Sequence, residues 1–121
     1  DALAGRKCLT AEELSALPLI LPRRLSVQSE LANWFDSAYS RLNICFTSNL
    51  STNSSLMVRQ GLGYAIVIHG SLPLLDETKM AYRPLSPALW TTSVPAWRRQ
   101  QPFSPAATTF IAFLKDFLTT A

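Results

Sequence analysis

The sequence predicts an α/β domain with a mostly parallel sheet flanked by helices. Three observations lead to this class: apolar runs of strand length are bounded by proline or glycine, apolar residues recur at helical spacing between those runs, and the two patterns alternate. Strands that alternate with helices are typical of parallel sheets covered by helices. At 121 residues, 48% of them apolar, the chain is long enough for one domain with a buried core.

The first half of the chain predicts two helices and two strands. Residues 9–17 predict a short helical turn, because Thr10 can cap it and acidic residues follow in the first turn. The apolar run 17–22 is bounded by prolines and is typical of a fully buried parallel strand. After Ser29, which can cap a helix, apolar residues recur at helical spacing. Residues 42–47 are rich in β-forming side chains and predict the second strand.

A glycine-containing corner joins the next helix to the next strand. The helix is predicted over residues 52–60 and the strand over residues 64–68. Gly61 can adopt the left-handed conformation that ends the helix after Gln60. Gly63 permits a tight turn into the strand or a close approach to the helix.

The last part of the chain predicts four further elements: a short helix capped by Ser71 over 71–77, strands over 80–85 and 88–97, and a helix over 104–118. Pro95 makes the strand 88–97 an edge strand or a strand end. Apolar residues spread around much of the last helix, and burying six of them would be worth about 1.5–3 kcal/mol each. We therefore expect part of the surface that covers this helix to be missing from the chain or to come from another copy.

Composition excludes several classes of function. With one histidine and two separated cysteines, Cys8 and Cys45, a metal site is improbable, and two reduced thiols are expected. The net charge of +3 includes only short basic doublets, which do not form a nucleic-acid patch. No apolar run reaches the ~18 residues of a membrane span, and no signal peptide opens the chain. Because the chain does not begin with Met, we expect a piece of a longer protein.

Candidate binding residues follow the predicted strands, because ligands of open α/β sheets bind beyond the carboxyl ends of the strands. The candidates are Pro22, Arg23 and Arg24 after the first strand, Ser48, Asn49, Leu50, Ser51 and Thr52 after the second, and His69, Gly70 and Ser71 after the third. The second group also begins a helix, whose free N–H groups and dipole favour an anion. Arginine can bind a carboxylate in bidentate fashion. The hypothesis is a small anionic ligand and no cofactor.

Each candidate also has a purely structural interpretation. Ser51 and Thr52 are compatible with ordinary helix caps, and Arg23 and Arg24 with solvated loop charges. His69 is compatible with a strand-end residue satisfied by the backbone. An enzyme would need a nucleophile, a base and an orienting group; Ser71, His69 and Asp76 are close in sequence, but no G-x-S-x-G elbow is present. We do not expect an enzyme.

Four blocks of the sequence, in order, resemble the C-terminal effector domain of LysR-type transcriptional regulators. They are LAGRKCLTAEELSALPLIL (3–21), NSSLMVRQGLGYAI (53–66), YRPLSP (82–87) and WRRQQPFSPAATTFIAFL (97–114). The second block resembles the family's corner between helix and strand, and the last resembles its closing strand and helix. The blocks together span nearly the whole chain.

The resemblance implies a fold like that of a small periplasmic binding protein, in which two α/β lobes enclose a small molecule. Residues 1–87 would form lobe two, and residues 88–121 would hold the return crossover strand and a C-terminal helix that belongs to lobe one. The first part of lobe one and the winged helix-turn-helix would be absent from this chain.

The resemblance also implies a function. The chain would sense a small effector that modulates DNA binding by the absent helix-turn-helix, in a cytoplasmic homo-oligomer (dimer or tetramer) without membrane contact. Trp34 and Phe35 would be lobe core, on a helix that could also face a partner copy. A fragment of a transport-type solute-binding protein, which shares the fold, is the alternative, and a small α/β enzyme is the third interpretation.

Overall fold

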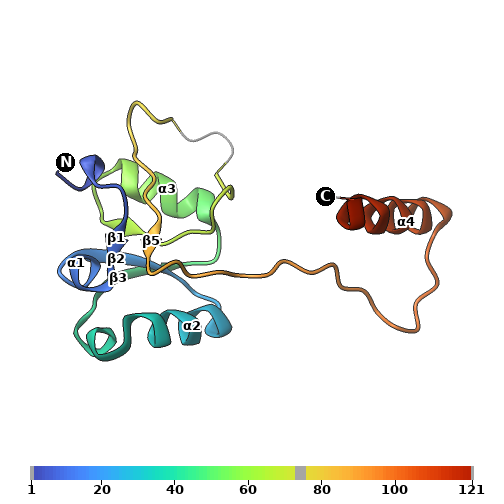
Figure 1. Ribbon diagram of the computed structural model, residues 1–121, viewed down its shortest axis with the longest axis horizontal. Helices are drawn as coiled ribbons and strands as arrows, with labels where there is room; N and C mark the ends of the chain where they lie inside the picture. The colour runs from blue at the N-terminus through green and yellow to red at the C-terminus, as the bar shows by residue number, and fades with distance from the viewer. Residues whose placement is uncertain (1, 73–75, 121) are drawn as a thin grey trace. The chain divides into compact units, whose positions relative to one another are not determined.

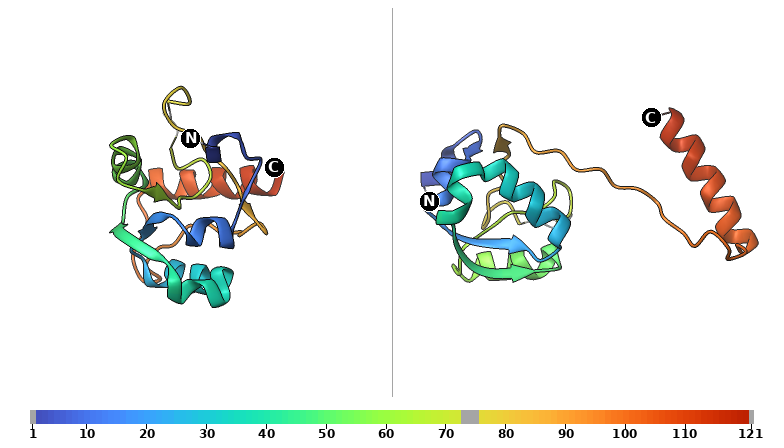
Figure 2. Two further views of the ribbon diagram at one scale, coloured as in Figure 1. Left: turned by 90° about the vertical axis from the view of Figure 1, so that its left-hand side faces the viewer. Right: turned by 90° about the horizontal axis from the view of Figure 1, so that it is seen from below.

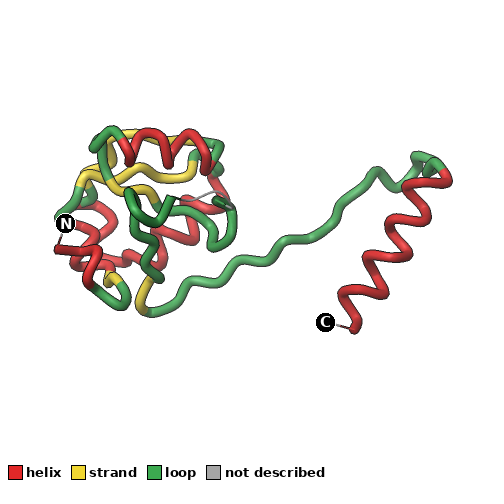
Figure 3. Tube along the Cα trace, turned by 90° about the horizontal axis from the view of Figure 1, so that it is seen from above, coloured by secondary structure: helices red, strands yellow, loops and turns green. Residues whose placement is uncertain are grey.

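The computed structural model describes residues 2–72 and 76–120. It divides into two compact units, Asp1–Thr91 (unit 1) and Thr92–Ala121 (unit 2), and each is described by itself. In unit 1, helices lie on both sides of the strands (Figure 1; Figure 2). Unit 2 consists of an extended segment and one helix (Figure 3).

A parallel three-stranded sheet lies at the centre of unit 1. Its strands are β2 (Pro18–Pro22), β3 (Asn43–Ser48) and β4 (Tyr64–Ala65), in the order β3-β2-β4. A second parallel pair joins β1 (Leu9–Thr10) to β5 (Leu85–Ser86). The α/β class with parallel strands is therefore confirmed.

Helices and 3₁₀ turns connect the strands. In chain order they are η1 (Ala2–Gly5), α1 (Ala11–Ser15), α2 (Leu25–Phe35), η2 (Asp36–Arg41), α3 (Ser51–Arg59) and, in unit 2, α4 (Pro105–Thr120). Figure 1 shows α2 on one side of the sheet and α3 on the other. This arrangement explains why the middle strand is apolar throughout, since both of its faces are covered.

The core forms where β2 meets the helices. Leu19, Ile20 and Leu21 of β2 are almost completely buried. Leu19 and Leu21 belong to one apolar cluster with Leu31 and Phe35 of α2. The prolines at both ends of β2 confine this apolar run to one strand, as the sequence predicted.

Helix α2 begins earlier than the sequence predicted. It starts at Leu25 with Arg24 as the N-cap residue, and Ser29 lies inside the helix. The Ser29 hydroxyl donates a hydrogen bond to the Leu25 carbonyl oxygen at 3.0 Å, which is the bond that a serine makes within a helix. The prediction of Ser29 as the cap is therefore wrong. A serine hydroxyl can either cap the start of a helix or bond to a carbonyl oxygen one turn earlier within it, and the local sequence fits both.

The corner between α3 and β4 has the predicted conformation. Gly61 has φ of 73°, and its N–H donates to the Val58 carbonyl oxygen at 2.9 Å. The Leu62 N–H donates to the Met57 carbonyl oxygen at 3.1 Å, so that the helix ends in a Schellman motif. Gly63 lies so close to β2 that an added Cβ atom would be 2.8 Å from the Pro18 carbonyl oxygen.

Several predicted strands are shorter than the sequence suggested. Strand β4 ends at Ala65 rather than residue 68, and β5 is two residues long rather than residues 80–85. Residues 88–97 form no strand, and all of them are exposed. A strand exists only where a neighbour completes its hydrogen-bonded ladder, and an amino-acid pattern cannot supply that neighbour.

The prediction of a short helix over residues 71–77 is wrong for the residues that the structure describes, because residues 71, 72, 76 and 77 are not helical. Residues 73–75 lie outside the described residues. The predicted C-terminal helix is confirmed as α4, and the Ala107 N–H donates to the Ser104 hydroxyl oxygen at 3.2 Å. None of the residues described in α4 is buried.

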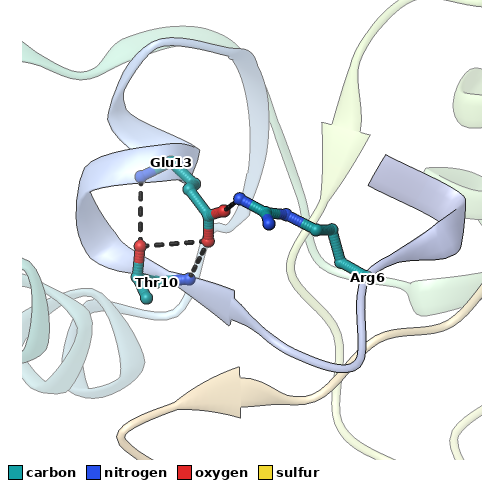
Figure 4. Close-up of polar contacts among 3 residues, drawn as sticks. All are labelled: Arg6, Thr10 and Glu13. Carbon is teal, nitrogen blue, oxygen red and sulfur yellow. Dashed lines mark hydrogen bonds and ion pairs between the residues drawn. The ribbon is translucent and has the colours of Figure 1, made fainter. Parts of the chain in front are cut away.

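Thr10 is the N-cap residue of α1, as the sequence predicted, and it forms a capping box with Glu13. The Glu13 N–H donates to the Thr10 hydroxyl oxygen at 3.3 Å, and the Thr10 N–H donates to a Glu13 carboxylate oxygen at 2.9 Å (Figure 4). Arg6 forms an ion pair with the same carboxylate. The backbone N–H of Thr10, with smaller contributions from its hydroxyl and from Arg6, holds the pKa of Glu13 below its ordinary value.

This box predicts a pH dependence of stability. Because the Glu13 pKa is lowered in the folded chain, its contribution is present above the ordinary value of 4.5 and is lost as pH falls through the lower folded pKa. Between pH 7 and acid conditions below pH 4.5, the chain should lose more free energy of unfolding than Glu13→Gln loses. Urea denaturation at several pH values measures this difference. The variant Glu12→Gln removes the same charge from the same turn but keeps the box, so it should behave like the unmodified chain.

Candidate functional site

The carboxyl ends of the strands meet at one edge of the sheet. Pro22 and Ser48 are register partners at the ends of β2 and β3. The Arg23 N–H then donates to the Ser48 carbonyl oxygen at 2.9 Å, which joins the two chain segments just beyond the strands. On the other side of β2, the Ile66 N–H donates to the Ile20 carbonyl oxygen at 3.1 Å, and the chain continues to His69. The strand ends that the sequence singled out therefore share one edge, which we call the strand-end edge (Pro22–Arg24, Ser48–Thr52 and His69–Gly70).

The amino terminus of α3 lies at the strand-end edge. The N-cap residue is Leu50, whose side chain makes no capping hydrogen bond, and Ser51 and Thr52 are the first helical residues. The first hydrogen bond of the helix joins the Ser54 N–H to the Leu50 carbonyl oxygen at 3.2 Å. The N–H groups of Ser51, Thr52 and Asn53 therefore precede the helical ladder. The interpretation of Ser51 and Thr52 as helix caps is wrong, because the cap position lies one residue earlier.

Arg23 and Arg24 supply positive charge at the same edge. Both residues are exposed. Within residues 2–72 and 76–120, the two ion pairs are Arg6–Glu13 and Asp76–Lys79, so neither guanidinium is paired with a carboxylate of the described chain. Asn49 and Leu50 are exposed in the loop between β3 and α3. The edge thus combines exposed guanidinium groups with backbone N–H groups, the donors that suit a carboxylate or phosphate.

Ser48 has a different role from the one that the sequence suggested. Its hydroxyl donates to the Leu50 carbonyl oxygen at 2.9 Å and accepts the Leu50 N–H at 3.3 Å. A serine hydroxyl has a single donor, and here that donor is already used. Ser48 is therefore not placed to donate a hydrogen bond to a ligand.

His69 and Gly70 lie at the far end of the edge. The His69 ring packs edge-to-face against Tyr82, with ring centroids 5.3 Å apart. Burial raises the pKa of Tyr82, and its hydroxyl donates to the Val67 carbonyl oxygen at 3.4 Å. Gly70 has φ of 78°, a left-handed conformation that suits glycine. Tyr82 was not predicted as a neighbour of His69, because nothing in the local sequence pattern indicates a contact between these segments.

The three residues considered for an enzyme have other partners. The Asp76 carboxylate accepts hydrogen bonds from the Thr78 N–H and hydroxyl and pairs with Lys79. These contacts, and chiefly the Thr78 hydroxyl, lower the pKa of Asp76. The Ser71 hydroxyl oxygen is buried and, within the described chain, has no hydrogen-bond partner. A relay from Ser71 through His69 to Asp76 is therefore not formed.

A cavity of about 750 Å³ in unit 1 lies beside β4. Pro22 and His69 line it, together with apolar residues from two segments that the sequence analysis did not connect, 64–68 and 80–90. The other predicted site residues are not among those that line it. The cavity thus meets the strand-end edge at Pro22 and His69, but its lining does not include Arg23, Arg24 or the start of α3.

Neither a metal site nor a membrane-spanning helix is found among the described residues. No group of three or more histidine, cysteine or acidic side chains is arranged to hold a metal ion within residues 2–72 and 76–120. Cys8 and Cys45 are free and exposed. Across the same described ranges, no helix has the length and hydropathy needed to cross a membrane.

Comparison with known proteins gives the class to which this fold belongs. Residues 1–119 match the family model of the LysR substrate binding domain. Searches of curated proteins and of solved structures find no match. Because the model covers nearly the whole chain, the chain belongs to the LysR substrate-binding-domain family. Its fold is the periplasmic-binding-protein-like fold of the effector-binding part of LysR-type transcription regulators, a regulatory and non-enzymatic family.

Proposed function

We propose that this chain is the effector-sensing part of a cytoplasmic LysR-type regulator, and that it binds a small anionic metabolite at the strand-end edge. Binding there modulates DNA recognition by a helix-turn-helix that lies outside this chain. The observation that carries the proposal is the unpaired charge of Arg23 and Arg24 beside the uncapped amino terminus of α3. Guanidinium groups and free helical N–H groups both favour an anion.

The domain assignment belongs to the same proposal. In this proposal residues 1–87 form lobe two of the effector domain, and residues 88–121 form the return crossover and the helix of lobe one, as the resemblance to the family implies. The apolar residues of α4, among them Phe110, Phe113 and Phe117, support a further surface that covers this helix, which we propose belongs to lobe one or to another copy. We also propose that the regulator is a homo-oligomer. Strand β3 supports this, because it lies at the sheet edge with Ile44 and Phe46 42% and 41% exposed.

Thermal unfolding of the full 121-residue chain with three small probes tests the anion site. Inorganic phosphate and acetate should raise the melting temperature progressively with the logarithm of their concentration above the dissociation constant, whereas the neutral acetamide should not. Arg23→Ala with Arg24→Ala should weaken the affinity for phosphate by about 12- to 160-fold for each hydrogen bond lost, because a hydrogen bond to a charged group is worth about 1.5–3 kcal/mol.

The second basic doublet provides a matched control. Arg98→Ala with Arg99→Ala removes the same charge from unit 2, and it should leave the phosphate affinity unchanged. If acetamide raises the melting temperature while phosphate and acetate do not, the anionic effector is contradicted. Equal losses from the two doublets would show that phosphate responds only to net charge.

A further inference from the structure

Helix α3 begins at a residue whose side chain cannot cap it. Serine, threonine, aspartate and asparagine are the usual N-cap residues, because their oxygen accepts an N–H from the first turn. Leu50 has no such oxygen, and its side chain is 55% exposed. The N–H groups at this helix start are therefore not bonded by a cap side chain, and neither a cap nor buried packing of the Leu50 side chain holds the first residue in place.

Two serines hold the Leu50 backbone instead. The Ser48 hydroxyl donates to the Leu50 carbonyl oxygen at 2.9 Å and accepts the Leu50 N–H at 3.3 Å. From inside the helix, the Ser54 hydroxyl donates to the same carbonyl oxygen at 3.3 Å. Ser54 is only 6% exposed. Both polar groups of the Leu50 peptide are therefore fixed by side chains on either side of it.

Ser48 also connects this helix start to the neighbouring strand end. Its carbonyl oxygen accepts the Arg23 N–H at 2.9 Å, directly after β2. A second side chain, Gln28 of α2, donates to the Pro22 carbonyl oxygen at 3.1 Å. Ser48, at the end of β3, thus bonds to the backbone of Arg23, next to the guanidinium groups. It also bonds to the backbone of Leu50, where the free N–H groups of α3 begin.

We infer that Ser48 and Ser54 are positioning residues of the effector site, which set the place of the α3 amino terminus relative to Arg23 without contacting the effector. This inference rests on the proposed function, because it concerns the same edge. The sequence predicted that the Ser48 hydroxyl would contact the ligand. In this inference it bonds to the protein backbone instead. The affinity of the site for an anion then depends on two hydroxyl groups that do not touch the anion.

Phosphate titration of the full chain, followed by the amide NMR signals of residues 51–53, tests the inference. Ser48→Ala should weaken phosphate binding about 2- to 12-fold, the range given by one hydrogen bond of about 0.5–1.5 kcal/mol. Ser54→Ala should have an effect of the same order. Ser48→Thr keeps the hydroxyl and suits a strand position, so it should restore the affinity.

Ser55→Ala is the matched control, because the Ser55 hydroxyl donates to the Thr52 carbonyl oxygen at 2.7 Å and does not reach Leu50. It should leave phosphate affinity unchanged. A purely structural role for Ser48 would lower the melting temperature without a separate effect on affinity that threonine restores. Equal affinity losses from Ser48→Ala and Ser55→Ala, or no restoration by Ser48→Thr, would overturn the inference.

Hydrogen exchange without any ligand separates this inference from the proposed function. The Ser54 amide, which donates to the Leu50 carbonyl oxygen, should exchange about 2- to 12-fold faster in Ser48→Ala and at the unmodified rate in Ser55→Ala. If phosphate shifts no amide signal of the unmodified chain, the anion site fails, while the exchange rates still decide the role of Ser48. Unchanged exchange at Ser54 in Ser48→Ala would overturn the positioning role.

Discussion

Replacing Gly63 by alanine is expected to lower the free energy of unfolding by about 3 kcal/mol, the sum of backbone strain and overpacking. The residue has φ of 153°, where side chains are rarely tolerated. An added Cβ would lie 2.8 Å from the Pro18 carbonyl oxygen and 3.4 Å from Ile20 Cγ1. Because the close neighbour is backbone of the central strand, the clash cannot be relieved by a rotation of a side chain. Urea denaturation followed by circular dichroism measures the loss.

Gly61 is the natural control for this prediction, because it lies two residues away in the same corner. It has φ of 73°, but no atom lies within 4 Å of an added Cβ. Gly61→Ala should therefore show only the cost of the left-handed conformation, about 1 kcal/mol. Equal losses for the two variants would mean that the close approach to Pro18 contributes nothing.

The glycine corner matters for the site because it sets where α3 lies against the sheet. The Schellman motif ends α3, and the contact of Gly63 with Pro18 brings the chain onto β2 at the strand's first residue. Helix α3 runs from the strand-end edge to this corner, so different contacts fix its two ends. The corner holds its carboxyl end, and the Ser48–Leu50 contacts hold its amino end.

The sequence predicted those parts of the fold that depend on local chemistry. Strand β2 is apolar and bounded by prolines, α1 has its N-cap at Thr10, and Gly61 ends α3. In each case a few consecutive residues contain the whole physical reason for the structure. The juxtaposition of the strand ends was also predictable, because parallel strands place their carboxyl ends on one edge.

The errors concern features that depend either on partners distant in sequence or on the exact geometry of a turn. Residues 67, 68 and 88–97 have strand-like side chains, but they belong to no strand in the described structure. Ser48 was predicted to meet a ligand because its position at a strand end is visible in the sequence. Its hydrogen bonds to Leu50 depend on the exact turn between β3 and α3, which the sequence pattern does not reveal. The same limit applies to the contact between His69 and Tyr82.

The second large effect is expected at Leu19, because the middle strand carries the core. Leu19 is 0% exposed and packs in the cluster that contains Leu31 and Phe35 of α2. It is register partner of Ile44 on one side and of Tyr64 on the other, so backbone ladders hold its position from both sides. The surrounding residues therefore cannot easily collapse into a cavity at this place.

Leu19→Ala should lower the free energy of unfolding by about 2–5 kcal/mol, from the lost burial and from the cavity that remains. This is a large fraction of the ~5–15 kcal/mol that stabilises a typical domain, so the variant should unfold at much lower urea concentration. Leu25→Ala, at a residue of α2 that is 78% exposed, is the control and should change the free energy by less than about 0.5 kcal/mol. A loss at Leu19 no larger than the loss at Leu25 would contradict a core centred on β2, and with it the rigid sheet on which the strand-end edge depends.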